Sequence, residues 1–287
     1  MNKKLIDTLT PNFNILVEKN EPFLEEVNKY LQDLLEINHK IHYIDQIDKK
    51  YLEEYFLASD LFIVYKKTNK DLLNRALENF LPILFIDTED LPSFYALHIK
   101  DEPPQKIAAI IALLADNRRL RRKIIQHQIE KTNIRPEIIY QIEGSFDSSY
   151  SLAIVNREIS RALNKKHPDK VALYSTDGYG DFDPDKEFLE ENPDIKHMYQ
   201  KSKKAYHAPV VLRNPYPPRV YDMKGHINAM TSYGWEESEY PKEYLEDFNK
   251  YLDILPIMSP YVEKVMIDNG IKIPVKTVGI GVDHILK

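Results

Sequence analysis

The chain has 287 residues, is 43% hydrophobic and 29% charged, and carries a formal net charge of −6, values ordinary for a soluble globular protein of about two domains. The absence of cysteine excludes disulfides and thiolate chemistry, and the negative charge argues against a nucleic-acid-binding protein. We expect a cytoplasmic protein, because no apolar run approaches the roughly 20 residues of a membrane span and residues 1–5 lack the apolar core of a signal peptide.

The first half alternates short apolar runs with amphipathic patterns. Strands are predicted in four apolar runs, at 14–17, 40–44, 61–64 and 83–86. Helices are predicted between and after them, at 21–36, 49–58, 70–80, 104–115 and 117–131. This alternation indicates βαβ crossovers and a mainly parallel sheet. The segment 131–137, which contains Pro136, is the expected boundary between domains at 1–135 and 138–287.

The second half begins with a strand, a glycine turn and a helix. An apolar run at 138–142 leads into Gly144-Ser145-Phe146-Asp147-Ser148, and apolar residues then recur at helical spacing from Leu152 to Leu163. Asp147 or Ser148 is the expected cap of this helix. The N–H groups and dipole of a helix N-terminus favour an anion, so a sugar, phosphate or diphosphate is the expected ligand. A βα turn that binds nothing is the alternative.

Further strands are predicted at 170–175, 209–213, 254–258 and 274–278. A helix is predicted from Pro260 to Asn269, with Ser259 as its N-cap and Gly270 at its end. Repeated prolines between 177 and 245 indicate an irregular stretch of the kind that forms binding loops. In Asp181-Phe182-Asp183, the aspartates fit a turn and the cap of a helix at 185–191 better than a metal pair, so no metal site is expected.

Five blocks of the second half carry a resemblance to a known family. They are Glu143–Arg157, Gly178–Pro184, Arg213–Val220, Tyr233–Ser238 and Val278–His284. In this order, over about 145 residues, they resemble the N-terminal, acceptor-side domain of family-4 glycosyltransferases of the GT-B fold. In that family the glycine turn faces the interdomain cleft, and the Gly-Val-Asp block lies where the chain crosses to the donor-binding domain. The resemblance implies metal-independent sugar transfer with a nucleotide-sugar as co-substrate and no cofactor.

The first half resembles the closing part of a donor-binding domain of the same fold, through Tyr51–Phe62, Ile107–Leu114 and Leu120–Ile125. Where the family has two glutamates, this chain has Lys67 and Arg75, and a cation cannot accept bonds from ribose hydroxyls. We therefore interpret this domain as degenerate. The two halves also stand in reversed order. The chain is thus expected to be a segment of a larger or tandem enzyme, or to need a donor domain from an adjoining module or a partner chain.

The candidate site residues come from these blocks. Glu236 and Glu237, two acids beside an aromatic residue, are the candidate catalytic pair, which could orient an acceptor hydroxyl or act as general base. The candidate substrate-binding residues are Gly144, Ser145, Phe146, Asp147, Ser148, Arg213, Asn214, Tyr216, Trp235 and Asp283. Other interpretations stay open for some of these residues. Glu236 and Glu237 could be solvated loop acids, Arg213 could pair with surface acids, and Asp283 could stabilise the crossover.

The sequence thus predicts an α/β protein with two Rossmann-like domains of mainly parallel sheet. The expected function is sugar transfer from a nucleotide-sugar to a glycan, lipid or protein acceptor. The alternative is an inactive relative that binds glycan or scaffolds an active partner. A dinucleotide enzyme is disfavoured because no G-x-G-x-x-G follows either first strand. The basic stretch Arg118–Lys123 suggests at most peripheral contact with anionic lipid, its alternative being a solvated face near a helix C-terminus.

Overall fold

The computed structural model describes residues 12–281 except 36, 37, 133, 135 and 204–207, together with residues 5, 8 and 9. The chain divides into two compact units, unit 1 at residues 1–135 and unit 2 at residues 136–287. The division falls within the proline-containing segment 131–137. No helix in the described part of the chain has both the length and the apolar character needed to cross a membrane.

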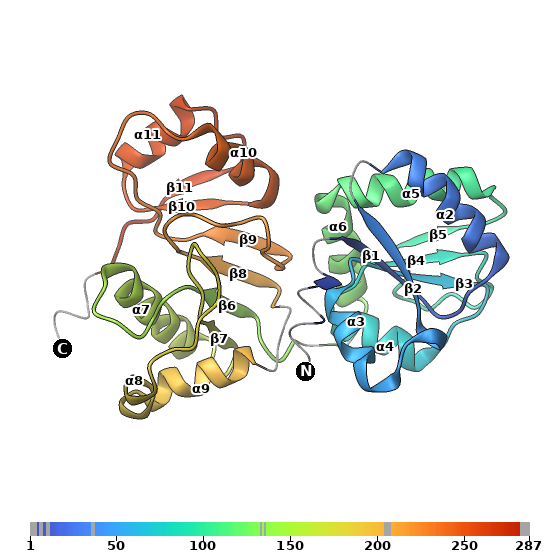
Figure 1. The fold of residues 1–287 in the computed structure, drawn as a ribbon, viewed down its shortest axis with the longest axis horizontal. Coiled ribbons are helices and arrows are strands. Elements are labelled where there is room, and N and C mark those ends of the chain that lie inside the picture. The colour runs from blue at the N-terminus through green and yellow to red at the C-terminus, as the bar shows by residue number, and fades with distance from the viewer. Residues whose placement is uncertain are drawn as a thin grey trace. The chain divides into compact units, whose positions relative to one another are not determined.

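Unit 1 is built on a five-stranded parallel sheet in the order β2–β1–β3–β4–β5 (Figure 1). Its strands are β1 (Phe13–Val17), β2 (His39–Tyr43), β3 (Leu61–Tyr65), β4 (Ile83–Ile86) and β5 (Leu97–Ile99). The three inner strands are buried along almost their whole length, whereas the edge strand β2 is partly exposed. A parallel sheet is covered on both faces, which explains the continuous apolar sequence of its inner strands.

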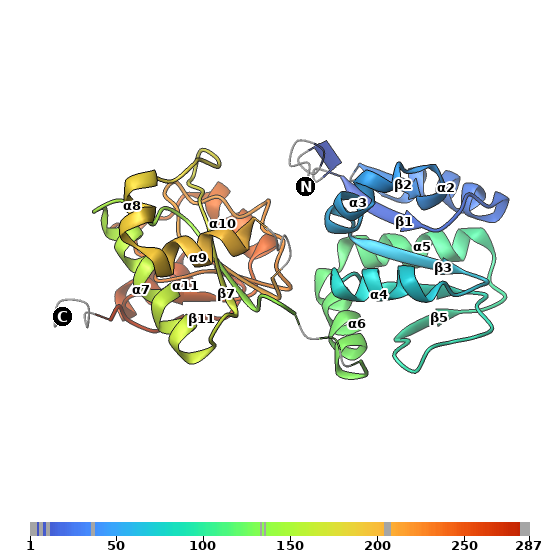
Figure 2. The ribbon, with the colours of Figure 1, turned by 90° about the horizontal axis from the view of Figure 1, so that it is seen from below.

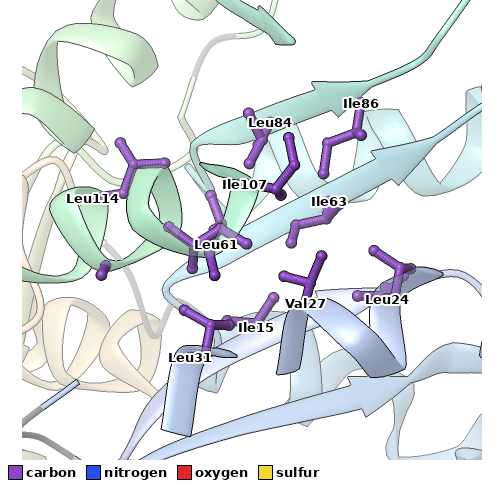
Figure 3. Close-up of a cluster of buried hydrophobic side chains, with 14 of the residues drawn as sticks. Ile15, Leu24, Val27, Leu31, Leu61, Ile63, Leu84, Ile86, Ile107 and Leu114 are labelled. Atoms are coloured by element: carbon purple, nitrogen blue, oxygen red, sulfur yellow. The ribbon is translucent and has the colours of Figure 1, made fainter. Parts of the chain in front are cut away.

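Helices cover both faces of the sheet in unit 1. They are α2 (Pro22–Leu34), α3 (Leu52–Ala58), α4 (Lys70–Glu78), α5 (Pro104–Asp116) and α6 (Arg118–Glu130), with short 3-10 helices at Ile44–Gln46 and Lys49–Tyr51. On one face, Leu24 and Leu31 of α2 and Ile107 of α5 lie against Ile15 and Ile63 of the sheet (Figure 3). A separate cluster, which includes Phe56 of α3 and Leu77 of α4, covers the other face.

The basic stretch in α6 contributes to this packing. Arg121 donates from Nη1 to the carbonyls of Leu114 and Ala115, and its guanidinium lies 5.3 Å from the ring centroid of Phe13. The acceptors are at the end of α5, where the helix dipole favours a cation. At least one cation of this stretch therefore belongs to the internal structure of unit 1.

Unit 2 contains a four-stranded parallel sheet in the order β7–β6–β8–β9 and a parallel pair, β10–β11. Its strands are β6 (Tyr140–Glu143), β7 (Val171–Tyr174), β8 (Val210–Arg213), β9 (Ile227–Met230), β10 (Leu255–Ile257) and β11 (Val275–Thr277). Parallel bridges from Ala229 to Ile254 and from Tyr233 to Ile257 join β9 to the pair. The strands thus follow one another in a single layer (Figure 1).

The helices of unit 2 form two groups. They are α7 (Ser151–Lys166), α8 (Lys186–Glu191), α9 (Pro193–Ser202), α10 (Lys242–Tyr251) and α11 (Pro260–Asp268). The first three pack with β6 and β7 around Ile142 and Leu173, and α9 runs beside β7 (Figure 2). The last two pack with β9 and β10 around Phe248 and Leu255.

The predicted α/β class, with Rossmann-like units of mainly parallel sheet, is confirmed. Helix α11 also follows its sequence pattern: Ser259 accepts a bond from the N–H of Val262, Pro260 is the first helical residue, and Gly270 has a φ of 95° just beyond the end. Strand β5 was not predicted, because three residues are too few to show a strand pattern. The stretch 177–245 was predicted to be irregular apart from a helix at 185–191 and a strand at 209–213, which are α8 and β8, but it also contains α9, β9 and the start of α10.

Candidate functional site at the sheet edge of unit 2

Two central strands of unit 2 end side by side. Strand β6 ends at Glu143 and β8 at Arg213, and these residues are register partners. The chain runs from β6 to β7 on one side and later places β8 on the other side, so its winding direction reverses between β6 and β8. In open α/β sheets, ligands bind outside the carboxyl ends of the strands at such a switch point. Gly144 and Asn214, which follow the two strands, occupy this position.

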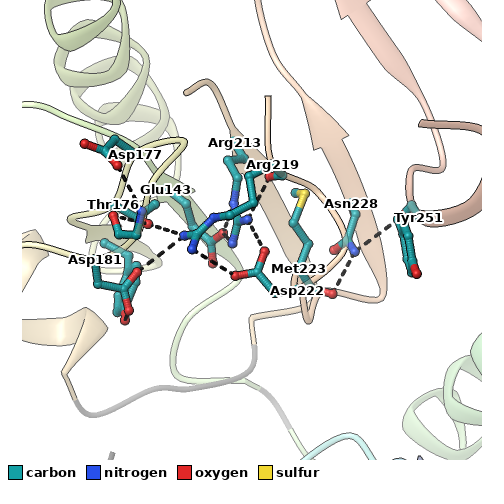
Figure 4. Close-up of polar contacts among 12 residues, drawn as sticks. Glu143, Thr176, Asp177, Asp181, Arg213, Arg219, Asp222, Met223, Asn228 and Tyr251 are labelled. Atoms are coloured by element: carbon teal, nitrogen blue, oxygen red, sulfur yellow. Dashed lines mark hydrogen bonds and ion pairs between the residues drawn. The ribbon is translucent and has the colours of Figure 1, made fainter. Parts of the chain in front are cut away.

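A buried ion-pair network lies at this edge (Figure 4). Arg213, only 3% exposed, donates to Glu143 from Nε at 2.7 Å and from Nη2 at 2.5 Å. Its Nη1 donates to Asp222 at 2.5 Å and to the carbonyl of Arg219 at 2.8 Å. Burial alone would lower the pKa of Arg213, but the carboxylates of Glu143 and Asp222 outweigh burial and raise the pKa above its ordinary value. Arg213 stays charged and positions the residues around it.

Arg219 extends the network to the connection that follows β7. Its Nη2 donates to Thr176 Oγ1 at 2.5 Å, and its guanidinium lies 3.5 Å from the carboxylates of both Asp181 and Asp222 (Figure 4). Tyr174, the last residue of β7, donates from its hydroxyl to Asp181 at 2.7 Å. The connection after β7 is thereby held against the connection after β8.

The glycine turn lies at the same edge. A Cβ atom at Gly144 would stand 2.3 Å from Nδ2 of Asn156, a residue of α7, so a larger residue has no room there. The same Asn156 amide donates to the carbonyl of Ser145 at 2.9 Å. The predicted turn is therefore fixed by a side chain of the helix that follows it.

The predicted cap of α7 was wrong. The N-cap residue is Tyr150, and no side chain caps the helix. Ser148 Oγ accepts instead from the N–H of Tyr150 at 3.4 Å, and Asp147 accepts from the N–H of Asp185 at 2.7 Å. The chain takes several further residues before it becomes helical, so Asp147 lies too far from the first turn and binds the residue that caps α8.

The remaining residues predicted near the turn differ in exposure. The ring of Phe146 is fully buried and packs against Tyr199 at a centroid distance of 5.7 Å, so we assign it to the core. Asn214 is 3% exposed, and its Nδ2 is one of the buried polar atoms without a hydrogen-bond partner among the described residues. Tyr216 is 60% exposed. Asp283 lies outside the described residues.

Trp235 follows β9 at the same edge of the sheet. Its Nε1 donates to the carbonyl of Glu239 at 2.8 Å, and its ring meets that of Tyr240 edge-on at 4.8 Å. Tyr240 and Tyr233 share a hydroxyl hydrogen bond of 2.9 Å, and burial raises the pKa of both phenols. Both hydroxyls therefore stay neutral, and the ring of Tyr240 packs against the indole.

The candidate catalytic acids lie in solvent. Glu236 and Glu237 are both exposed, and the hydroxyl of Tyr261 donates to the backbone carbonyl of Glu236 at 3.0 Å. This bond holds the main chain of the segment and leaves both carboxylates accessible. Such an arrangement permits contact with a ligand but does not by itself create a general base.

In unit 1, the two cations that replace the expected glutamates are on the surface. Arg75 of α4 pairs with Glu53 of α3 at 3.0 Å, and Lys67 is exposed in the connection before α4. An open pocket of about 580 Å³ lies beside this connection, lined among others by Thr68, Lys70 and Phe94. Its walls come from the connections that follow β3 and β4, on the carboxyl side of the sheet.

Sequence reasoning missed the residues that organise the edge of unit 2. Glu143, Asp222, Arg219 and Thr176 form the network with Arg213, but none was predicted as a site residue. One signal was available: two apolar strands end in residues of opposite charge, Glu143 and Arg213. Their pairing also required the order of the strands, which the sequence pattern does not determine.

Among the described residues, no three histidine, aspartate or glutamate side chains gather in a way that could hold a metal ion. Comparisons with protein-family models, with curated proteins and with solved structures give no match to this chain. The arrangement of residues at the edge of unit 2 is therefore the basis for the proposals that follow.

Proposed function

We propose that this chain takes part in sugar transfer from a nucleotide-sugar, with unit 2 as the side that binds the acceptor. One observation carries the proposal: the Gly144 turn, the Arg213–Asn214 segment and the Trp235 segment all follow the carboxyl ends of strands in one layer. Segments separated by about 90 residues in sequence thereby lie along the edge where open α/β sheets bind ligands.

The chemistry of the edge suits a sugar. The start of α7 carries no side-chain cap, so its first N–H groups can meet the hydroxyl or phosphate oxygens of a ligand. The indole of Trp235 offers an aromatic face to a sugar ring. The exposed carboxylates of Glu236 and Glu237 can accept bonds from sugar hydroxyls, and one of them would act as the base when an acceptor is in place.

Calorimetric titration of the chain with UDP- and GDP-sugars tests the proposal. Binding with a dissociation constant in the micromolar range, about −8 kcal/mol or stronger, is the result that a donor site within this chain requires. A transfer assay with any nucleotide-sugar that binds then follows. If no nucleotide-sugar binds to the full chain, the chain has no donor site of its own, and the proposed transfer function is contradicted for this chain.

A second function is favoured by the structure of unit 1: a non-enzymatic module that binds glycan or scaffolds an active partner. Arg75 is committed to an ion pair with Glu53, at a place where the resemblance requires a carboxylate for the donor. An Arg75→Glu variant leaves like charges together and should not restore donor binding. The module would bind glycan without binding a nucleotide-sugar, and the titration above separates the two functions.

A further inference from the structure

Two exposed aromatic side chains come from neighbouring connections beside the buried network. Tyr179 is 88% exposed and Tyr216 is 60% exposed. Their neighbours in sequence touch: a Cβ atom at Gly178 would lie 2.3 Å from the carbonyl oxygen of Pro217. The two residues thus come from the connections after β7 and after β8, and they form what we call the tyrosine platform.

The backbone beneath Tyr179 is held in place. The carboxylate of Asp177 accepts from the N–H groups of Tyr179 and Gly180 at 2.7 and 3.0 Å, and the N–H of Asp177 donates to the carbonyl of Gly180 at 2.8 Å. Thr176 forms an antiparallel bridge with Asp181 at the base of this loop. An aromatic ring on a fixed loop can bind a ligand at a small cost in conformational entropy.

Both connections are also tied to each other. Arg219, from the connection after β8, binds Thr176 at 2.5 Å and lies 3.5 Å from Asp181, both in the connection after β7. Tyr179 and Tyr216 are therefore presented by one cross-linked structure. Exposed tyrosine side chains are enriched at recognition surfaces, because they combine a large apolar ring with a polar hydroxyl.

The charge around the platform restricts the ligand. Asp177, Asp181, Asp183 and Asp185 lie in the connection that carries Tyr179, and Asp222 lies in the connection that carries Tyr216. Carboxylates accept hydrogen bonds from hydroxyl groups and repel phosphate, sulfate and carboxylate groups. These five carboxylates outnumber the two cations of the same connections, Arg219, which is already bonded to the protein, and Lys224. The surface therefore favours a ligand that is rich in hydroxyls and carries no negative charge.

We propose that the tyrosine platform binds an uncharged oligosaccharide, with sugar rings stacked on Tyr179 and Tyr216 and sugar hydroxyls bonded to Asp177 and Asp181. The identification of this oligosaccharide as the acceptor rests on the proposed function. Binding itself does not, because the platform is complete within unit 2.

Saturation-transfer NMR on the full chain tests this, without any nucleotide-sugar present. The probes are maltopentaose, mannopentaose and chitopentaose, with pentagalacturonic acid as an anionic probe of equal length. At least one neutral probe should receive saturation on its ring C–H protons and bind more tightly than the anionic probe. No binding by any neutral probe at millimolar concentration, or equal binding by the anionic one, would overturn the proposal.

Variants locate the site. Tyr179→Ala and Tyr216→Ala should each weaken binding by about tenfold or more, the usual loss for one aromatic anchor, whereas Tyr179→Phe and Tyr216→Phe should retain it. The matched control is Tyr95→Ala, which removes an exposed tyrosine of unit 1. Because Tyr179 is almost fully exposed, its alanine variant should fold, which the fluorescence of Trp235 verifies.

Equal losses in the control and the platform variants, or unchanged affinity in Tyr179→Ala and Tyr216→Ala, would place the site elsewhere and overturn the proposal. The two proposals can fail separately. Glycan binding at the platform without nucleotide-sugar binding contradicts only the transfer function. Nucleotide-sugar binding without glycan binding contradicts only the platform.

Discussion

Glu143 and Arg213 end neighbouring strands and form an ion pair of 2.5 Å while both are almost completely buried. A buried charge is costly unless it is paired, and each of these charges is compensated by the other, with Asp222 and Gln141 completing the bonds. The pair joins two segments that are 70 residues apart in sequence. It therefore fixes the relative position of the glycine turn and the connection that carries Tyr216.

Removal of one member of this pair should destabilise unit 2 strongly. Arg213→Met leaves Glu143 charged and buried without its main partner, so we expect a loss of about 3 to 5 kcal/mol in the free energy of unfolding. The double variant Arg213→Met with Glu143→Leu should recover much of this loss, because no unpaired charge remains. The measurement is urea unfolding followed by Trp235, the single tryptophan of the chain, which lies in unit 2. Equal stabilities of the single and double variants would contradict the account.

Gly144→Ala should destabilise unit 2 by about 1 to 3 kcal/mol, because the new Cβ would overlap a buried side chain. The overlap is with Asn156 Nδ2, at 2.3 Å. Asn156→Ala in the same chain should make the glycine substitution nearly neutral, at the cost of the bond to Ser145. Gly281→Ala is the control, since a Cβ atom there meets no atom within 4 Å. A Gly144→Ala variant as stable as this control would show that the turn accommodates a side chain.

The local elements of the site were predictable from the sequence, but the contacts between these elements were not. The strand at 138–142, the turn at Gly144 and the helix after it follow from apolar spacing and one glycine. The pairing of Glu143 with Arg213 depends on β8 lying next to β6, which is a property of the whole sheet. Phe146 illustrates a second limit: a turn residue among polar neighbours looks like a binding residue, but its ring fills the core between β6 and α9.

The stability of unit 1 should fall between pH 6.5 and about pH 4 because of His42. Burial, followed by the nearby charge of Lys40, lowers the pKa of His42 from 6.5 to about 4. The unfolded chain therefore binds a proton in this range that the folded unit does not. The contribution of His42 to the free energy of unfolding is fully present above pH 6.5 and is lost as the pH falls toward about 4. Since the ring is partly exposed, we expect about 1 to 2 kcal/mol of loss.

His42→Gln tests this effect, since an amide can still donate to Asn14, which His42 contacts at 2.8 Å. The variant should lose most of the pH dependence in hydrogen exchange of β1 and β2. His39→Gln is the comparison, because burial also lowers the pKa of His39 and a smaller change of the same sign is expected. A pH profile that His42→Gln leaves unaltered would assign the effect to other groups.

Glu236→Gln and Glu237→Gln address the catalytic step of the proposed function. If one of these carboxylates removes the proton from the acceptor hydroxyl, its amide variant should lower the transfer rate by about 100-fold or more and leave nucleotide-sugar affinity unchanged. Both side chains are exposed, so neither substitution should alter stability. Glu243→Gln, an exposed acid at the start of α10, is the matched control. Full transfer activity in both variants would remove these acids from the mechanism and leave the Trp235 segment a role in binding alone.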